Sequence, residues 1–277
     1  MATPLRSWVE IPDPRDAAVG GNANQWDLIV GSPYESVGTT DQAGIITVIQ
    51  DVSIPVSTST TQMWTEAQLG FADGVEAYDR FGFSLAYRAS GGVGYLAVGV
   101  PYENIGSIQD AGVAYLFTSQ GTSLNPVTVV HQDVPGLLGM AQAGDNFGAS
   151  VALAGSGVTG SDVHLAVGIP YEDVGPGDTI KDAGAVQVFP VNHLTNDALY
   201  TQESPGIAGD PAPQELMGLA LANASTASEG VLLVSVPWDT VHGGMVQVIP
   251  YRGGPPRIWT HGQGAVPIGW GVAANGD

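Results

Sequence analysis

GDNFGASVALAGSGVTGSDVHLAVGIPYEDVGPGDTIKDAGAVQVF, residues 144–189, contains three short motifs that recur along the chain. The first is an aromatic or apolar residue followed by glycine, at Phe81-Gly82, Phe147-Gly148, Met217-Gly218 and Trp270-Gly271. The second is an apolar run ending in Gly-x-Pro, at Pro33, Pro101, Pro170 and, in a degenerate form, Pro237. The third is a glycine that begins another apolar run, at Gly44, Gly112, Gly184 and Gly244. The prolines lie 68, 69 and 67 residues apart, and so regular a period indicates repeated structural units.

Each unit is predicted to contain four β-strands and no helix. Runs such as FGFSLAY (81–87), YLAVGV (95–100) and GVAYLF (112–117) are rich in Val, Leu, Tyr and Phe and are bounded by Gly, Pro, Asn and Asp. A fourth, weaker run follows in each copy, around Trp64, Val130, Tyr200 and Trp259. Repeated units of four strands are typical of β-propeller blades. We therefore predict an all-β chain, with residues 1–277 forming a single β-propeller domain.

The copies run over about residues 15–72, 79–140, 145–210 and 215–264, and residues 265–277 are predicted to form a closing strand. The segment RSWVEIP (6–12) resembles RIWTHG (257–262), so we expect it to be an outer, fourth-type strand. The first copy has a poor first strand around residues 16–19, which the closing strand could replace. Four blades would then close into a ring by pairing N- and C-terminal strands. The other possibility is an incomplete ring that a second chain completes, so the chain is expected to be a monomer or a ring-completing homodimer.

The order of these motifs, Phe-Gly, an apolar strand ending in Gly-x-Pro, then Ala-Gly and a last strand, resembles the FG-GAP repeat of integrin α-subunit propellers. The segments GIPYEDVG and KDAGAVQVF are similar to those of integrin-like FG-GAP proteins common in actinobacteria. The resemblance covers about residues 17–272. It implies an integrin-like propeller that acts in extracellular recognition or cell adhesion, although integrin propellers have seven blades. A shared fold by itself does not fix an activity.

Many FG-GAP repeats bind calcium through Asp-x-Asp-x-Asp-Gly between their first and second strands. The corresponding loops here are VGGNANQWD (19–27), RASGGVGY (88–95), AGSGVTGSD (154–162) and NASTASEG (223–230). Each carries at most one carboxylate, near its end, and Asn22 and Asn24 are compatible with remnants of such a site. Calcium takes six to eight oxygen ligands, several of them from carboxylates. The calcium motifs are therefore absent or degenerate, and we expect no cofactor and no metal site in the chain.

The chain is strongly acidic, with 27 Asp and Glu against 7 Lys and Arg and a formal net charge of −20. Such a charge disfavours nucleic acid and anionic membrane surfaces, and it favours a metal ion or a protein or small-molecule ligand that carries positive charge. Solubility alone is the other interpretation of the charge.

No apolar run approaches the ~20 residues that cross a bilayer, so no membrane insertion is expected. Residues 1–8 lack the apolar core of a signal peptide. The resemblance implies an extracellular protein, and a cytoplasmic one is the alternative.

The loops between the second and third strands carry an aromatic residue followed by an acid in every copy. Because equivalent positions of a ring share one face, these pairs would form a pocket with aromatic walls and a negative rim. The predicted ligand-binding residues are Tyr34, Glu35, Tyr102, Glu103, Tyr171, Glu172, Trp238 and Asp239. The architectural interpretation is that each acid accepts backbone N–H groups and each aromatic ring packs between blades.

The copies also differ in these loops, and function often follows such differences. The fourth loop is the shortest and contains His242, while the third is the longest and contains Lys181, the sole lysine of the chain. With Glu103, Glu172 and Asp239, these residues could form an acid–base set. The simpler interpretation is a solvated lysine and a turn histidine. We therefore expect a non-catalytic propeller that binds a ligand or protein partner on this face. The alternative is a biosynthetic enzyme, similar to a cyclase or lyase, with an acidic, aromatic pocket at the centre of the propeller.

Overall fold

The computed structural model describes residues 7–11, 26–52, 60–70, 74–120, 123–155, 163–225, 230–252 and 257–260. In these residues the protein forms four antiparallel sheets of four strands each. The first sheet contains β1 (Ser7–Ile11), β2 (Trp26–Ser32), β3 (Ile45–Val52) and β4 (Thr60–Trp64). The second contains β5 (Ser84–Ser90), β6 (Val93–Val100), β7 (Val113–Gln120) and β8 (Ser123–Val130). The third contains β9 (Ser150–Ala154), β10 (His164–Ile169), β11 (Ala185–Pro190) and β12 (Ala198–Tyr200), and the fourth contains β13 (Leu221–Asn223), β14 (Gly230–Val236), β15 (Met245–Arg252) and β16 (Arg257–Thr260).

Within each sheet the strands follow one another in chain order, each paired with the next. One short 3₁₀ turn, η1 (Glu66–Gln68), follows β4, and the described residues contain no α-helix. The prediction of an all-β chain is thereby confirmed for the described residues, and the last three predicted copies contain four strands each. The first sheet also has four strands, but β1 lies before the predicted start of its copy at about residue 15. The fourth strands end at or near the predicted Trp64, Val130, Tyr200 and Trp259.

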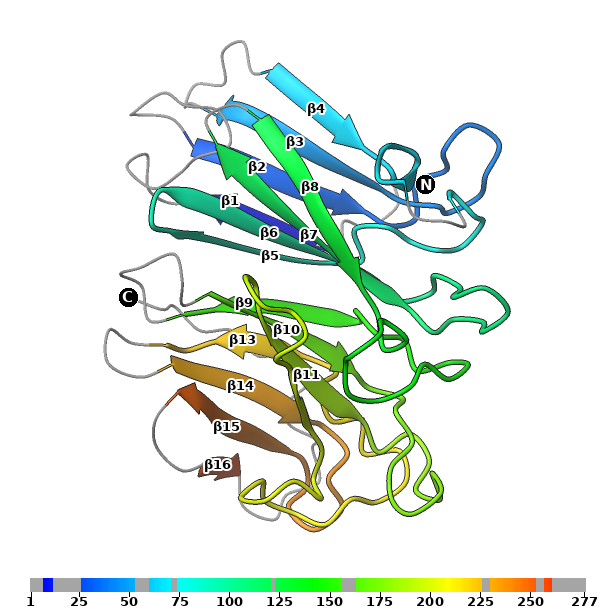
Figure 1. The fold of residues 1–277 in the computed structure, drawn as a ribbon, viewed down its shortest axis with the longest axis vertical. Helices are drawn as coiled ribbons and strands as arrows, with labels where there is room; N and C mark the ends of the chain where they lie inside the picture. The colour runs from blue at the N-terminus through cyan, green and yellow to red at the C-terminus, as the bar shows by residue number, and fades with distance from the viewer. Residues whose placement is uncertain are drawn as a thin grey trace.

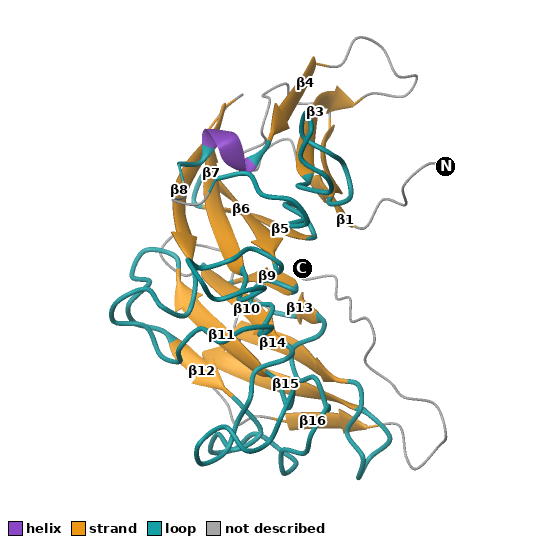
Figure 2. Cartoon of the chain, turned by 90° about the vertical axis from the view of Figure 1, so that its right-hand side faces the viewer, coloured by secondary structure: helices purple, strands orange, loops and turns teal. Residues whose placement is uncertain are grey.

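The four sheets follow one another in a curved row, with the first and the last at opposite ends of the molecule (Figures 1 and 2). The first strands of successive sheets contact each other, β1 with β5, β5 with β9 and β9 with β13. Both faces of an inner sheet are therefore covered by its neighbours.

A separate apolar core lies between each pair of neighbouring sheets. The first joins Ile46 and Val48 of β3 to Phe81 and the odd-numbered residues of β7. The second packs Ala114 and Leu116, the even-numbered residues of β7, against the third sheet. The third core joins β11 to Met217 and to β14. Alternation along β7 thus buries side chains on both faces of one strand, as the period of two dictates.

The glycine motifs recur because the backbones of neighbouring sheets touch at these points. A Cβ atom on Gly112 would lie 2.2 Å from the carbonyl oxygen of Phe147, and the Phe147 N–H donates to Ala111 O at 2.9 Å. A Cβ on Gly99, the glycine before Pro101, would lie 2.0 Å from the carbonyl oxygen of Gly148. Any side chain at these positions would force the sheets apart. The three sequence motifs therefore meet at each interface between sheets.

The N-terminal strand differs from the prediction. Residues 7–11 form β1, which pairs with β2 in the register Trp8↔Val30 and lies beside β5. This is the position of a first strand, and the expectation of an outer, fourth-type strand was wrong. Pairing with β2 decides the role of this segment, and its likeness to residues 257–262 does not reveal that partner. The predicted first strand at residues 16–19 and the closing strand at 265–277 lie outside the described residues.

Candidate functional site

The loops after β2, β6, β10 and β14 separate the two members of each aromatic–acid pair. The aromatic side chains lie toward the surface: Tyr171 is 38% and Trp238 41% exposed, and Tyr34 and Tyr102 are half-buried. Three of the acids are buried, namely Glu103, Glu172 and Asp239. Glu35, the fourth, is exposed. The acids thus belong to the interfaces between sheets more than to an open pocket.

Each buried acid is held by its own turn and meets the preceding sheet. The carbonyl oxygen of Glu172 accepts the N–H of Gly184 at 3.0 Å, which closes the loop, and the carboxylate accepts Gln132 Nε2 at 2.7 Å. Burial raises the pKa of Glu172 to about 7, and the hydrogen bond from Gln132 opposes that rise. Burial and the charge of Glu172 raise the pKa of Asp145 to about 8. These groups lie where sheets two and three meet.

The position directly before each Phe-Gly or Met-Gly motif holds a different residue at each interface. Arg80, Asn146 and Leu216 each stand directly before the Phe-Gly or Met-Gly motif, and all three have a positive φ, of 63°, 54° and 56°. The N–H of each donates to the loop of the preceding sheet, as in Arg80 to Gln42 O at 3.2 Å. The same backbone turn therefore presents a different side chain at each interface.

The three side chains behave differently. The Arg80 guanidinium lies over the rings of both Tyr34 and Tyr102, at 5.0 and 4.3 Å from their centroids. Asn146 turns back to the backbone, and its Nδ2 donates to Pro101 O and Asp110 O, both at 3.0 Å. Leu216 is too short to cover the rings on either side of it.

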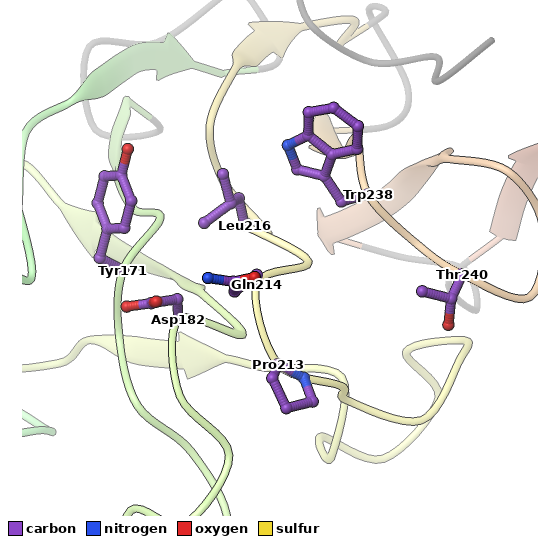
Figure 3. A pocket seen from close by; sticks show the side chains of 7 residues that line it. All are labelled: Tyr171, Asp182, Pro213, Gln214, Leu216, Trp238 and Thr240. Carbon is purple, nitrogen blue, oxygen red and sulfur yellow. The ribbon is translucent and has the colours of Figure 1, made fainter.

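Where Leu216 stands, a cleft of about 480 Å³ lies between the third and fourth sheets. Figure 3 shows Tyr171 and Trp238 on either side of Leu216, with the carboxylate of Asp182 and the amide of Gln214 below. Pro213 and Thr240 complete the lining. Partial burial and the nearby Asp173 raise the pKa of Asp182, while Lys181 lowers it. The cleft combines two aromatic walls with a carboxylate.

The residues proposed for acid–base chemistry do not come together in one site. Lys181 is exposed and forms an ion pair with Asp173 of its own loop. His242 Nδ1 lies 2.8 Å from Asp239 Oδ1, which also accepts the backbone N–H of His242 at 2.6 Å. Glu103 lies in the first interface, beside Glu66 and Asp79. The three acids of the set, Glu103, Glu172 and Asp239, thus lie in three successive interfaces.

Sequence reasoning singled out the aromatic residues of the cleft, and it missed Arg80, Leu216, Glu66 and Asp79. A signal for them exists in the chain. When the copies are aligned on their Phe-Gly and Met-Gly motifs, the preceding positions read Asp79-Arg80, Asp145-Asn146 and Glu215-Leu216. One aligned position thus holds Arg, Asn and Leu in the successive copies, which indicates that the interfaces differ chemically.

Comparison of the chain with protein-family models and with curated proteins gave no match. In the part of the chain that the structure describes, no helix is long and apolar enough to cross a bilayer.

Proposed function

We propose that this chain is a non-catalytic recognition module of the FG-GAP propeller type, and that a partner binds on the face formed by the loops between second and third strands. The four blade-like sheets and the motifs at their interfaces support the propeller assignment. The resemblance adds an extracellular, adhesive role.

We further propose that the cleft between Tyr171 and Trp238 takes a cationic side chain of the partner, preferably arginine. One observation carries this proposal: at the first interface, Arg80 of this chain already fills the equivalent space between Tyr34 and Tyr102. At the third interface Leu216 stands in its place and leaves the cleft open. A guanidinium stacks on aromatic faces and pairs with carboxylates, and Asp182 supplies the carboxylate.

The net charge of −20 supports a cationic partner, because it would steer positive groups toward the protein at low salt. Charge alone does not distinguish lysine from arginine. The two aromatic walls do, since the planar guanidinium stacks on rings more readily than the compact, strongly hydrated ammonium group.

Calorimetric titration of the protein with a tetra-arginine peptide tests the proposal, with tetralysine as the matched peptide. Trp238→Ala removes one wall without changing charge and is expected to weaken tetra-arginine binding about tenfold, the equivalent of ~1.4 kcal/mol. Leu216→Arg places an internal guanidinium in the cleft and should abolish binding there. Leu216→Met, similar in size, and Glu35→Gln, which removes an exposed charge on the same face, serve as controls. Equal binding of the two peptides, or unchanged binding by Trp238→Ala, would contradict the proposal.

An enzyme remains the alternative, because His242 and Asp239 form a hydrogen-bonded pair next to two residues of the cleft, Trp238 and Thr240. The same aspartate accepts the backbone N–H of His242, as turn-forming aspartates do. Under the binding proposal His242→Ala leaves tetra-arginine affinity unchanged.

Ring closure has its own test. A four-bladed ring closed by the chain ends predicts a monomer, whereas completion by a second copy predicts a dimer. Light scattering coupled to size-exclusion chromatography separates the two outcomes.

A further inference from the structure

A cluster of three acidic residues lies inside the molecule, at the first interface and away from the cleft. Glu66 at the start of η1, Asp79 in the turn before Phe81, and Glu103 in the loop after β6 each bring a carboxylate oxygen within 4.8 Å of the others. Their exposed fractions are 2%, 1% and 0%. Three acids from two sheets thus converge in a space closed to solvent.

Two of the three carboxylates, those of Glu66 and Glu103, lack the well-formed hydrogen bonds that buried carboxylates normally accept. Neither oxygen of Glu66 and neither oxygen of Glu103 accepts a hydrogen bond of acceptable geometry. Glu66 interacts with the Glu103 carboxyl and with the buried hydroxyl of Tyr115. Asp79 differs, because its Oδ2 accepts the N–H of Glu76 at 2.6 Å. A buried, charged oxygen without a partner is costly.

The other two interfaces show what this position normally holds. The residues equivalent to Glu66, Asp79 and Glu103 are Gln132, Asp145 and Glu172 at the second interface, and Gln202, Glu215 and Asp239 at the third. All six are buried. Gln132 donates its amide to Glu172 at 2.7 Å. At the first interface the amide is replaced by a third acid, so the donor is lost and a negative group is gained.

The surrounding charges increase the need for a counter-ion. The charges acting on Glu103 are those of Glu66, Asp79 and Glu76, all of them carboxylates. The Arg80 guanidinium, next in sequence to Asp79, is engaged by two tyrosine rings on the outer face.

We propose that Glu66, Asp79 and Glu103 form a binding site for a divalent cation of the size of Ca²⁺. Calcium binds oxygens at about 2.3–2.6 Å in flexible geometry, whereas Mg²⁺ demands near-ideal octahedral geometry at about 2.0–2.1 Å and usually keeps several waters. One carboxylate oxygen of each acid lies within 4.8 Å of the others, so all three can contact one cation. Because the site is closed to solvent, it favours the cation that gives up its waters more readily, which is Ca²⁺. The site lies between two sheets and is separate from the loops between first and second strands. The cation would link η1, which follows the first sheet, to the turn and loop of the second.

The test compares wild-type protein with Glu66→Gln, which recreates the second interface at the first. Both are stripped with EDTA, and their melting temperatures are measured at pH 7.5 with 5 mM CaCl₂ or MgCl₂. We expect Ca²⁺ to raise the melting temperature of the wild type by at least about 4 °C and Mg²⁺ to raise it less. Glu66→Gln should lose the shift and be no less stable than the wild type in EDTA. Glu35→Gln, an exposed acid, should keep the full shift.

Two results would overturn the site: no calcium shift in the wild type, or the same shift in Glu66→Gln. Should Glu66→Gln fail to fold, the site is tested by Tb³⁺ binding to the wild-type protein. Tb³⁺ bound at the site should emit light through energy transfer from the nearby Tyr115. One equivalent of Tb³⁺ that Ca²⁺ displaces supports the site. Absence of sensitised emission, or emission that Ca²⁺ does not reduce, counts against it. None of these results depends on the cationic cleft, because tetra-arginine binding is measured separately.

Discussion

The first and third interfaces between sheets share a backbone and differ in chemistry. In both, a residue with positive φ precedes an apolar residue that is fully buried, Phe81 or Met217. At the first interface Arg80 covers two tyrosine rings on the surface, and three acids meet beneath. At the third, Leu216 leaves a cleft open between Tyr171 and Trp238. The comparison teaches that glycine contacts fix the spacing of the sheets, so individual side chains can change without altering the fold.

Glycine substitution should break the shared backbone and produce the largest loss of stability. In Gly112→Ala the new Cβ would lie 2.2 Å from Phe147 O, at a φ of 84°. We expect the free energy of unfolding to fall by about 4 kcal/mol or more, a range typical of backbone clashes and special conformations. Gly106→Ala is the control, because its φ is 61° and its surroundings are open, so the loss should be about 1–2 kcal/mol. Urea unfolding measures both. Equal losses would mean that the close approach between sheets is unimportant.

Converting the second interface into a copy of the first tests why they differ. Gln132→Glu removes the donor 2.7 Å from Glu172 and adds a third acid to the buried pair of Asp145 and Glu172. In EDTA the variant should lose about 3 kcal/mol. If three buried acids suffice to hold calcium, most of that loss should be recovered in CaCl₂. Equal losses with and without calcium would show that the first site needs more than its three acids.

The contribution of the second interface to stability should depend on pH, with a smaller effect than the two substitutions above. The pKa of Glu172, raised to about 7 by burial, exceeds its value of ~4.3 in an unfolded chain. Between these values the folded state holds a proton that the unfolded state has released, so stability falls as pH rises from about 4.5 to 7. Glu172→Gln removes the contribution of Glu172 and should gain about 2 kcal/mol on the wild type across the window, below the limit of ~3.7 kcal/mol that a rise in pKa from ~4.3 to about 7 sets. Parallel profiles of melting temperature against pH for the two proteins would contradict the assignment.

The period of the motifs predicted the four sheets because each glycine contact must recur wherever two sheets meet. The sequence also placed the aromatic residues on one set of loops. It did not reveal that Glu103, Glu172 and Asp239 turn inward, because burial depends on the neighbouring sheet. Glu66 and Glu103 are far apart in sequence and belong to different repeats, so no local pattern brings them together. The role of residues 7–11 as β1 depends likewise on the partner strand, β2.

Exchanging Arg80 and Leu216, which lie between aromatic rings at the first and third interfaces, should have the smallest effect on stability. Arg80→Leu removes a guanidinium that lies 5.0 and 4.3 Å from the Tyr34 and Tyr102 centroids, and we expect a loss of about 1 kcal/mol. The variant should gain a cleft like that beside Leu216 and bind tetra-arginine at a second site, seen as a doubled stoichiometry by calorimetry. Combined with Leu216→Arg, it should move the binding site from the third interface to the first, with a stoichiometry of one. Arg80→Lys is the matched control, since the charge is kept and the planar stack is lost. A single site of unchanged affinity in Arg80→Leu would show that the aromatic pair alone does not make the cleft, and that Asp182 and Gln214 supply what the first interface lacks.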